Sequence, residues 1–216
     1  MKAFALTGEE RQQSRIRSAE KAVICLIIRM YLKAVEKTSR VIIEGEEKIG
    51  PDIMAGYWHG DGTGMYLVLA KLMKRLPDIA VIVTADERGD FIEDVLKHYG
   101  ARALRMPDGL RMRKRFPELM QEAKQAGTVI AAALDGPLGP LYEPKKLLFL
   151  LAKEADKEVW YFRLSYSRAV RSKTRWDIHA YPLPFSTIRV RAERIGRVDS
   201  GQLKNFEEYK KRFAVR

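Results

Sequence analysis

The residues best placed for chemistry lie in one glycine-rich turn, Tyr57 to Gly64. An apolar run from Ile53 to Trp58 leads into His59 and predicts a strand, and the segment Met65 to Leu76 predicts a helix after the turn. The strand would fix the imidazole, the glycines would let a ligand approach the backbone, and the helix start would offer unpaired N–H groups. His59 is therefore a candidate general base, and the alternative interpretation is a polar residue that only ends a strand.

Three further turns leave predicted strands through polar or glycine-rich residues: Thr84 to Asp90, Arg105 to Arg111 and Asp135 to Pro140. Ligands of open parallel sheets bind beyond the carboxyl ends of the strands, so all four turns are expected at one edge. That edge would hold carboxylates at Asp61, Asp86, Glu87 and Asp135 and arginines at Arg88, Arg105 and Arg111. A histidine base near an acid and a cluster of cations suits group transfer on an anionic substrate.

The rest of the chain predicts the elements that position these turns. Apolar runs predict strands at Val41–Glu44, Ile53–Trp58, Ile79–Thr84, Ala101–Met106, Thr128–Leu134, Glu158–Ser165, Trp176–Tyr181 and Thr187–Ile195. Helical spacing predicts helices at Met65–Leu76, Asp90–Tyr99, Leu110–Ala126, Lys145–Ala155 and Gln202–Phe213. Because strand and helix alternate, we expect one α/β domain with a mainly parallel central sheet flanked by helices. Its core would span residues 39–200, and a C-terminal helix would occupy 201–216.

The N-terminal segment, residues 1–38, predicts one long amphipathic helix from Glu9 to Lys37. Apolar residues recur along one side, and the opposite side carries Arg11, Arg15, Arg17, Lys21, Arg29, Lys33 and Lys37. Both a surface helix packed on the core and a membrane-contacting helix fit this pattern. The apolar run Ala22 to Leu32 is far shorter than the roughly 18–20 residues that a membrane span needs.

Composition narrows the partners and the compartment. A formal net charge of +12 implies an anionic partner: nucleic acid, anionic lipid headgroups or a phosphorylated small molecule. The basic residues are spread along the whole chain without a zinc-finger or aromatic-basic signature, so no nucleic-acid partner is expected. Met1 to Gln13 is polar and unlike a secretory signal, and the single cysteine, Cys25, allows no disulfide within the chain. Both features favour the cytoplasm.

Several common chemistries do not fit the sequence. The three histidines (His59, His98 and His179) have no paired metal-ligand spacing, and no cysteine cluster accompanies them, so no metal site is expected. No phosphate-binding glycine-lysine-serine/threonine loop follows a strand, and Gly60, Gly62 and Gly64 alternate too tightly for a dinucleotide fingerprint. A glycine-flanked serine nucleophile is also missing. What remains is a histidine base that activates a hydroxyl of the substrate.

Three sequence blocks together resemble one known superfamily. The blocks are Trp58-His59-Gly60, the run Asp135 to Pro140 (DGPLGP), and Arg175-Trp176-Asp177 with the run Pro182 to Ser186 (PLPFS). They resemble the bacterial uncharacterised-function branch of the lysophospholipid acyltransferase superfamily, related to glycerol-phosphate and lipid A acyltransferases. The likeness runs from about Arg40 to Val198, with the blocks in the expected order and spacing. It implies a glycerol-phosphate-acyltransferase-like fold.

The resemblance also implies roles for individual residues. The superfamily's catalytic histidine corresponds to His59, but the acid expected five positions later is Gly64 here, so Asp61 or Asp86 would orient the imidazole. The anion-binding arginine corresponds to Arg105. Asp135, Gly136 and Pro137 match the third block and would contact the substrate, although Asp135 could also only cap a helix or hold a tight turn. The block departs from the branch at Leu138, where arginine is common.

The activity that these residues imply is transfer of a fatty acyl group from an acyl thioester to a hydroxyl of an anionic lipid or lipid precursor. Acyl-CoA or acyl-carrier protein would be the donor, with no bound cofactor. The protein would lie on the inner face of the cell membrane, in contact with anionic lipids. The alternative is a non-catalytic lipid- or acyl-carrier-binding protein on the same fold, and nucleic-acid binding is a third, weaker interpretation of the charge.

Overall fold

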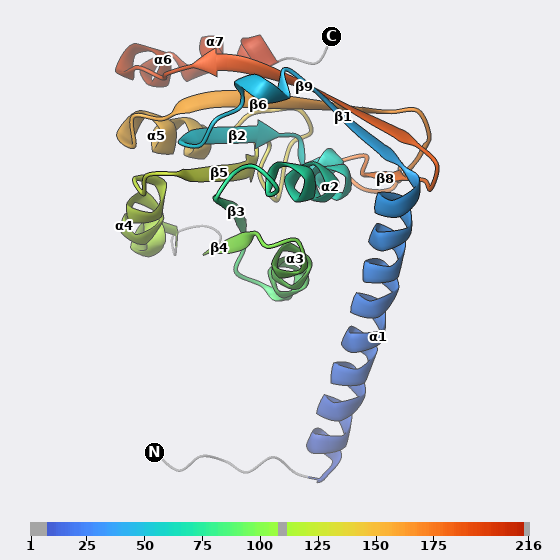
Figure 1. Ribbon diagram of the computed structural model, residues 1–216. Helices are drawn as coiled ribbons and strands as arrows, with labels where there is room; N and C mark the ends of the chain where they lie inside the picture. Colours follow the sequence, from blue (N-terminus) through green and yellow to red (C-terminus); the bar gives the residue numbers. More distant parts are fainter. Residues whose placement is uncertain (1–7, 108–111, 214–216) are drawn as a thin grey trace, which may run out of the picture.

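A computed structural model describes residues 8–107 and 112–213 of the chain (Figure 1). Its centre is a seven-stranded sheet in the order β1-β9-β6-β2-β5-β3-β4. In that order the strands are Arg40–Glu44, Thr187–Gly196, Glu158–Tyr166, Ile53–Tyr57, Thr128–Ala133, Asp78–Thr84 and Arg102–Met106. The five strands from β6 to β4 in this order are parallel to one another. β9 pairs antiparallel with β6, and β1 pairs parallel with β9. The predicted α/β class with a mainly parallel sheet is confirmed.

Helices cover both faces of the sheet (Figure 1). One face packs against α2 (Gly62–Leu72), α3 (Glu87–His98) and the last turns of α1 (Gly8–Thr38). The other packs against α4 (Met112–Ala123), α5 (Lys146–Glu154), α6 (Ser200–Lys204), α7 (Phe206–Tyr209) and the 3₁₀ turn η4 (Lys210–Phe213). Side chains of a strand point alternately to its two faces, and β2 follows this rule. Ile53, Ala55 and Tyr57 enter the first core, while Met54 and Trp58 enter the second.

Two elements differ from their predictions. The expected strand Trp176–Tyr181 is mostly a turn, because Ile178 has a φ of 44° and donates its N–H to the carbonyl of Arg175 at 3.1 Å. Only Ala180–Pro182 is extended; this is β8, which pairs with β7 (Ala169–Arg171) in a separate two-stranded ribbon. The expected C-terminal helix is broken into α6, α7 and η4, because Asn205 leaves helical geometry at ψ 42°.

The helix α1 extends away from the sheet (Figure 1). Its C-terminal part is anchored by Leu32 and Val35, which are buried. Further toward the N-terminus, five large apolar side chains are more than half exposed: Val23, Ile24, Leu26, Ile27 and Met30. Within the described residues, no helix combines the length and apolarity that crossing a bilayer would need.

Candidate functional site

The turn that carries His59 is tied to the turn that follows β5. β2 ends at Tyr57, and His59 begins a 3₁₀ turn, η2 (His59–Asp61), that leads directly into α2. The backbone N–H of His59 donates to Oδ1 of Asp135 at 2.8 Å, and the N–H of Leu134 donates to the carbonyl of Tyr57 at 2.7 Å. Two neighbouring parallel strands thus hold the histidine at their carboxyl ends, as the sequence predicts.

Asp135 differs from its predicted role of touching substrate. Its side chain is completely buried, and burial raises the pKa of its carboxyl although the N–H of His59 opposes the shift. The carboxylate holds the backbone of His59 through its N–H and has no exposed surface for a ligand. Gly136 and Pro137 do line the cavity that His59 faces, so these two residues lie where a substrate contact requires.

The acid that contacts the imidazole is Asp177. Its Oδ2 lies 2.7 Å from Nδ1 of His59. A carboxylate only accepts hydrogen bonds, so Nδ1 carries a proton, and in the neutral ring Nε2, on the opposite edge, has the lone pair. This is the tautomer that a general base needs, and His59 lines the cavity where a substrate would bind. The resemblance would place this acid at position 64, which is glycine here. The acid instead comes from a segment more than a hundred residues away in sequence.

Asp177 is held by two further side chains. Arg175 donates from Nε to Oδ1 and from Nη2 to Oδ2, both at 2.8 Å. His179 places Nδ1 3.0 Å from Oδ2. Burial alone would raise the pKa of Asp177, but the hydrogen bonds from Arg175, His59 and His179 outweigh it and hold the pKa well below its ordinary value. Asp177 is therefore an ionised carboxylate at neutral pH.

Gly60 explains how the Asp177 segment reaches His59. A Cβ atom on Gly60 would lie well inside the van der Waals distance of the Asp177 carbonyl oxygen. The backbone of residues 175–179 therefore packs directly against the His59 turn, and only glycine leaves room for it. This segment contributes Asp177 and His179 to the site.

Asp61 was expected to orient the imidazole, but its side chain bonds Tyr166 instead of His59. Its Oδ1 accepts a hydrogen bond from the Tyr166 hydroxyl at 3.0 Å, and the side chain is buried. Gly64 leaves room for the same phenol, since a Cβ there would collide with the Tyr166 oxygen. Burial raises the pKa of Asp61 to about 6, against the hydrogen bond from Tyr166. Asp86, the other expected acid, bonds Arg88 and the N-terminus of α3.

Asp61 gives a testable dependence of stability on pH. Its folded pKa of about 6 lies above its ordinary value of 3.8. The stabilisation is fully present below about pH 4 and is lost as the pH rises through about 6, because the unfolded chain releases the proton first. The loss is on the order of 3 kcal/mol at most. Asp61→Asn keeps an acceptor for Tyr166 and does not titrate, so its unfolding free energy should fall less over this range. Urea unfolding of both proteins from about pH 4 to 7 measures the difference, and a constant difference would contradict the buried carboxyl.

Arg105 also differs from its predicted role. Its guanidinium pairs with Asp90 and Glu93 of α3 and donates to the carbonyl of Thr84 at 2.9 Å. It links β4 to the start of α3, and it is not among the described residues that line the cavity. Arg88, in the first turn of α3, lines the cavity instead, although its Nε also donates to Asp86 at 2.8 Å.

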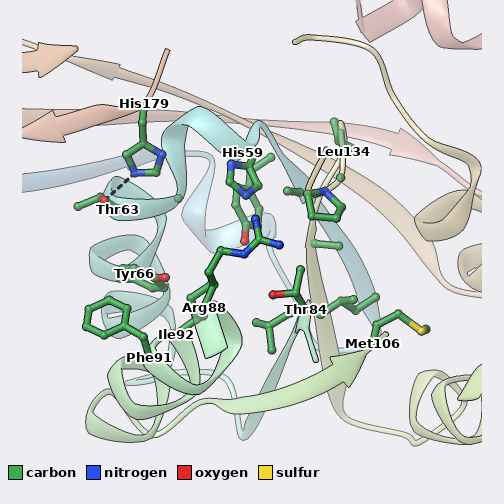
Figure 2. Close-up of a pocket in the computed structure, with 18 of the residues that line it drawn as sticks. His59, Thr63, Tyr66, Thr84, Arg88, Phe91, Ile92, Met106, Leu134 and His179 are labelled. Carbon is green, nitrogen blue, oxygen red and sulfur yellow. Dashed lines mark hydrogen bonds between the residues drawn. The ribbon is translucent and has the colours of Figure 1, made fainter. Parts of the chain in front are cut away.

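A cavity of about 1820 Å³ opens at the carboxyl edge of the sheet (Figure 2). Each of the four turns singled out from the sequence contributes to its wall, in the part of the chain that the structure describes: His59 and Thr63, Thr84 and Arg88, Met106 and Pro107, and Gly136 and Pro137 with the preceding Leu134. Much of the wall is apolar, including Ile24, Ile27 and Ile28 of α1. Its cationic residues are Arg88, Arg113, Lys145, Lys146 and Arg175.

His59, Asp177 and His179 also have the residue types of a metal site. Their ligand atoms lie within 4.8 Å of one another. However, both Nδ1 atoms contact Oδ2 of Asp177, and the Arg175 guanidinium already pairs with both carboxylate oxygens. A divalent cation would have to displace these donors beside a fixed positive charge. The arrangement fits proton transfer better than metal binding.

The sequence singled out part of this site. His59 was found from its place between a strand and a glycine-rich turn, whereas Asp177, His179 and Thr63 received no role. Arg175, Asp177 and His179 alternate in sequence, which is a weak signal for charged side chains gathered on one side of a segment. Comparison with known proteins adds nothing to these assignments, because no family model matches the chain and no curated protein is significantly similar to it.

Proposed function

We propose that the protein is an acyltransferase that moves a fatty acyl group from an acyl thioester to a hydroxyl of an anionic lipid or lipid precursor. The observation that carries this proposal is the His59–Asp177 pair, 2.7 Å apart, on the wall of a large and mainly apolar cavity. A base with a fixed tautomer activates a hydroxyl, and an apolar cavity accommodates an alkyl chain.

The size and lining of the cavity favour a lipid over a small polar metabolite. Its volume of about 1820 Å³ exceeds the roughly 300–1,000 Å³ of sites for small molecules. Ile24, Ile27 and Ile28 extend its apolar wall along α1, where an acyl chain can lie. Arg113, Lys145 and Lys146 add positive charge suited to a phosphate or carboxylate group.

In this mechanism, Nε2 of His59 accepts the proton of the acceptor hydroxyl as the oxygen attacks the thioester carbonyl carbon. The carbon–sulfur bond then breaks, and the thiol leaves with the proton. Asp177 stabilises the imidazolium formed on His59. Gly62 and Thr63 bring the start of α2 to the cavity wall, where the positive end of the helix dipole would stabilise a developing oxyanion. The base itself contributes roughly 10²–10⁴-fold to the rate.

The exposed apolar surface of α1 supports a location on the cell membrane. Val23, Leu26 and Met30 are more than half exposed, and Ile24 and Ile27 are both exposed and part of the cavity wall. Burying such a face in the lipid interface, with Arg29 and Lys33 nearby in sequence, would bring lipid to the cavity. The net charge of +12 favours an anionic, cytoplasmic leaflet. A glycerol-phosphate-acyltransferase-like fold and an acyl-CoA or acyl-carrier donor are parts of the same proposal.

The direct test is thioester consumption by the purified protein with lysophospholipid acceptors. His59→Ala should lower turnover by roughly 10²–10⁴-fold because it removes the base. His98→Ala is the matched control, since His98 ends α3 and is not part of the described cavity wall. Equal turnover by wild type and His59→Ala would contradict a catalytic role for His59.

The apolar cavity also favours a second function, non-catalytic binding of a lipid or acyl carrier. Saturable binding to anionic vesicles, without turnover of either thioester donor, would support it over the first. Binding should weaken as salt is raised, because the headgroup attraction is screened. A higher affinity for DNA than for anionic vesicles would contradict both functions.

A further inference from the structure

The site contains a second hydroxyl–histidine–carboxylate chain beside the first. Oγ1 of Thr63 lies 2.8 Å from Nε2 of His179, and Nδ1 of His179 lies 3.0 Å from Oδ2 of Asp177. Asp177 thus serves two histidines, whose ring centroids are 6.3 Å apart. Figure 2 shows the Thr63–His179 hydrogen bond next to His59. Thr63, His179 and His59 all line the cavity.

Hydrogen-bond chemistry fixes the direction of the proton along this chain. Asp177 is ionised and only accepts, so Nδ1 of His179 is the donor to it. Burial lowers the pKa of His179, against the bond from Asp177, so the ring is neutral and Nε2 carries a lone pair. The Thr63 hydroxyl must then donate to Nε2. Its oxygen keeps both lone pairs, as an activated nucleophile requires.

We propose that Thr63 is a nucleophile that carries the acyl group between donor and acceptor, with His179 as its base and Asp177 as the shared acid. The proposal rests on the acyl-transfer function above, and it replaces the direct attack of the acceptor on the thioester with two half-reactions. Each half-reaction has its own histidine, which explains why one carboxylate supports two imidazoles that face one cavity. A threonine that only steadied His179 would need no place on the cavity wall.

The two half-reactions balance without any further reactant. First, the Thr63 hydroxyl proton moves to Nε2 of His179, Oγ1 bonds to the thioester carbonyl carbon, and the carbon–sulfur bond breaks. The thiol leaves with the proton, and the acyl group is an ester of Thr63. Next, the acceptor hydroxyl, with His59 as its base, attacks the ester carbon and the bond to Oγ1 breaks. The proton given up by the acceptor ends on the restored Thr63 hydroxyl.

The test is to look for the acyl ester directly. Wild type, Thr63→Ser, Thr63→Val and His59→Ala are each incubated with palmitoyl-CoA without acceptor, quenched in acid and digested for peptide mass mapping. One palmitoyl group should appear on residue 63 in wild type and Thr63→Ser and be absent from Thr63→Val. It should approach one per chain in His59→Ala, because only the second half-reaction is impaired. Thr63→Val should also lower turnover with a lysophospholipid acceptor by at least about a hundredfold.

The outcomes separate this proposal from the function on which it rests. Lack of an acyl group at residue 63 in both wild type and His59→Ala overturns the nucleophile, as does unchanged turnover by Thr63→Val. Continued transfer to acceptor by wild type would then leave the acyltransferase function standing. An acyl ester on Thr63 that passes to no lysophospholipid supports the nucleophile and contradicts the transferase. Equal thermal melting of Thr63→Ser and Thr63→Val shows that the comparison is between folded proteins.

Discussion

Asp177→Asn is expected to lower acyl-transfer turnover by about 10³-fold or more, with little change in overall fold. Asparagine has the same shape, but one of its two polar atoms is a donor. If the amide nitrogen faces His59, Nδ1 must accept, and the ring proton moves to Nε2. A histidine protonated at Nε2 cannot take the proton of an attacking hydroxyl. Initial rates of thioester consumption across pH measure the effect.

The matched control is Asp61→Asn. Asp61 follows His59 by two residues in the same turn, and its side chain is buried like that of Asp177. Its partner is the Tyr166 hydroxyl, for which an amide oxygen is an adequate acceptor. Its turnover should stay within a few-fold of wild type. Loss of activity in Asp61→Asn with retention in Asp177→Asn would reverse the assignment and restore the acid suggested by the sequence.

Part of the site is encoded locally in the sequence. His59 lies between an apolar strand and a helix start, and both elements are formed by residues within about a dozen positions of it. The turns after β2, β3, β4 and β5 follow strands whose parallel pairing brings them to one edge. These features depend on period and composition alone, so the sheet and the location of the cavity were predictable.

The acid partner was not predictable in this way. Asp177 reaches His59 because β9 reverses direction beside β6 and the segment between them folds over the sheet edge. Nothing in the local pattern around Asp177 specifies that long-range packing. The same reason explains the incorrect roles of Asp61 and Arg105: each is close in sequence to the site, but Tyr166 and the α3 carboxylates bind them. Sequence proximity was a poor guide to which charges meet.

Gly60→Ala is expected to destabilise the fold by about 2–4 kcal/mol and to reduce turnover strongly. The added methyl group would overlap the backbone carbonyl of Asp177, which cannot rotate away like a flexible side chain. The segment 175–179 must shift, and with it the carboxylate 2.7 Å from His59 and the Thr63–His179 hydrogen bond. Urea unfolding and thioester consumption measure the two effects.

Gly62→Ala distinguishes this close approach from a general intolerance of alanine in the turn. Gly62 is two residues away and begins α2, and a Cβ there would meet only the His179 ring at 3.6 Å, an ordinary contact. Its φ of −52° is helical, so alanine should stabilise it slightly. Equal stability losses in the two variants would mean that the turn, rather than its contact with Asp177, requires glycine. A loss confined to Gly60→Ala would show that the His59–Asp177 pair depends on a backbone contact between two distant parts of the chain.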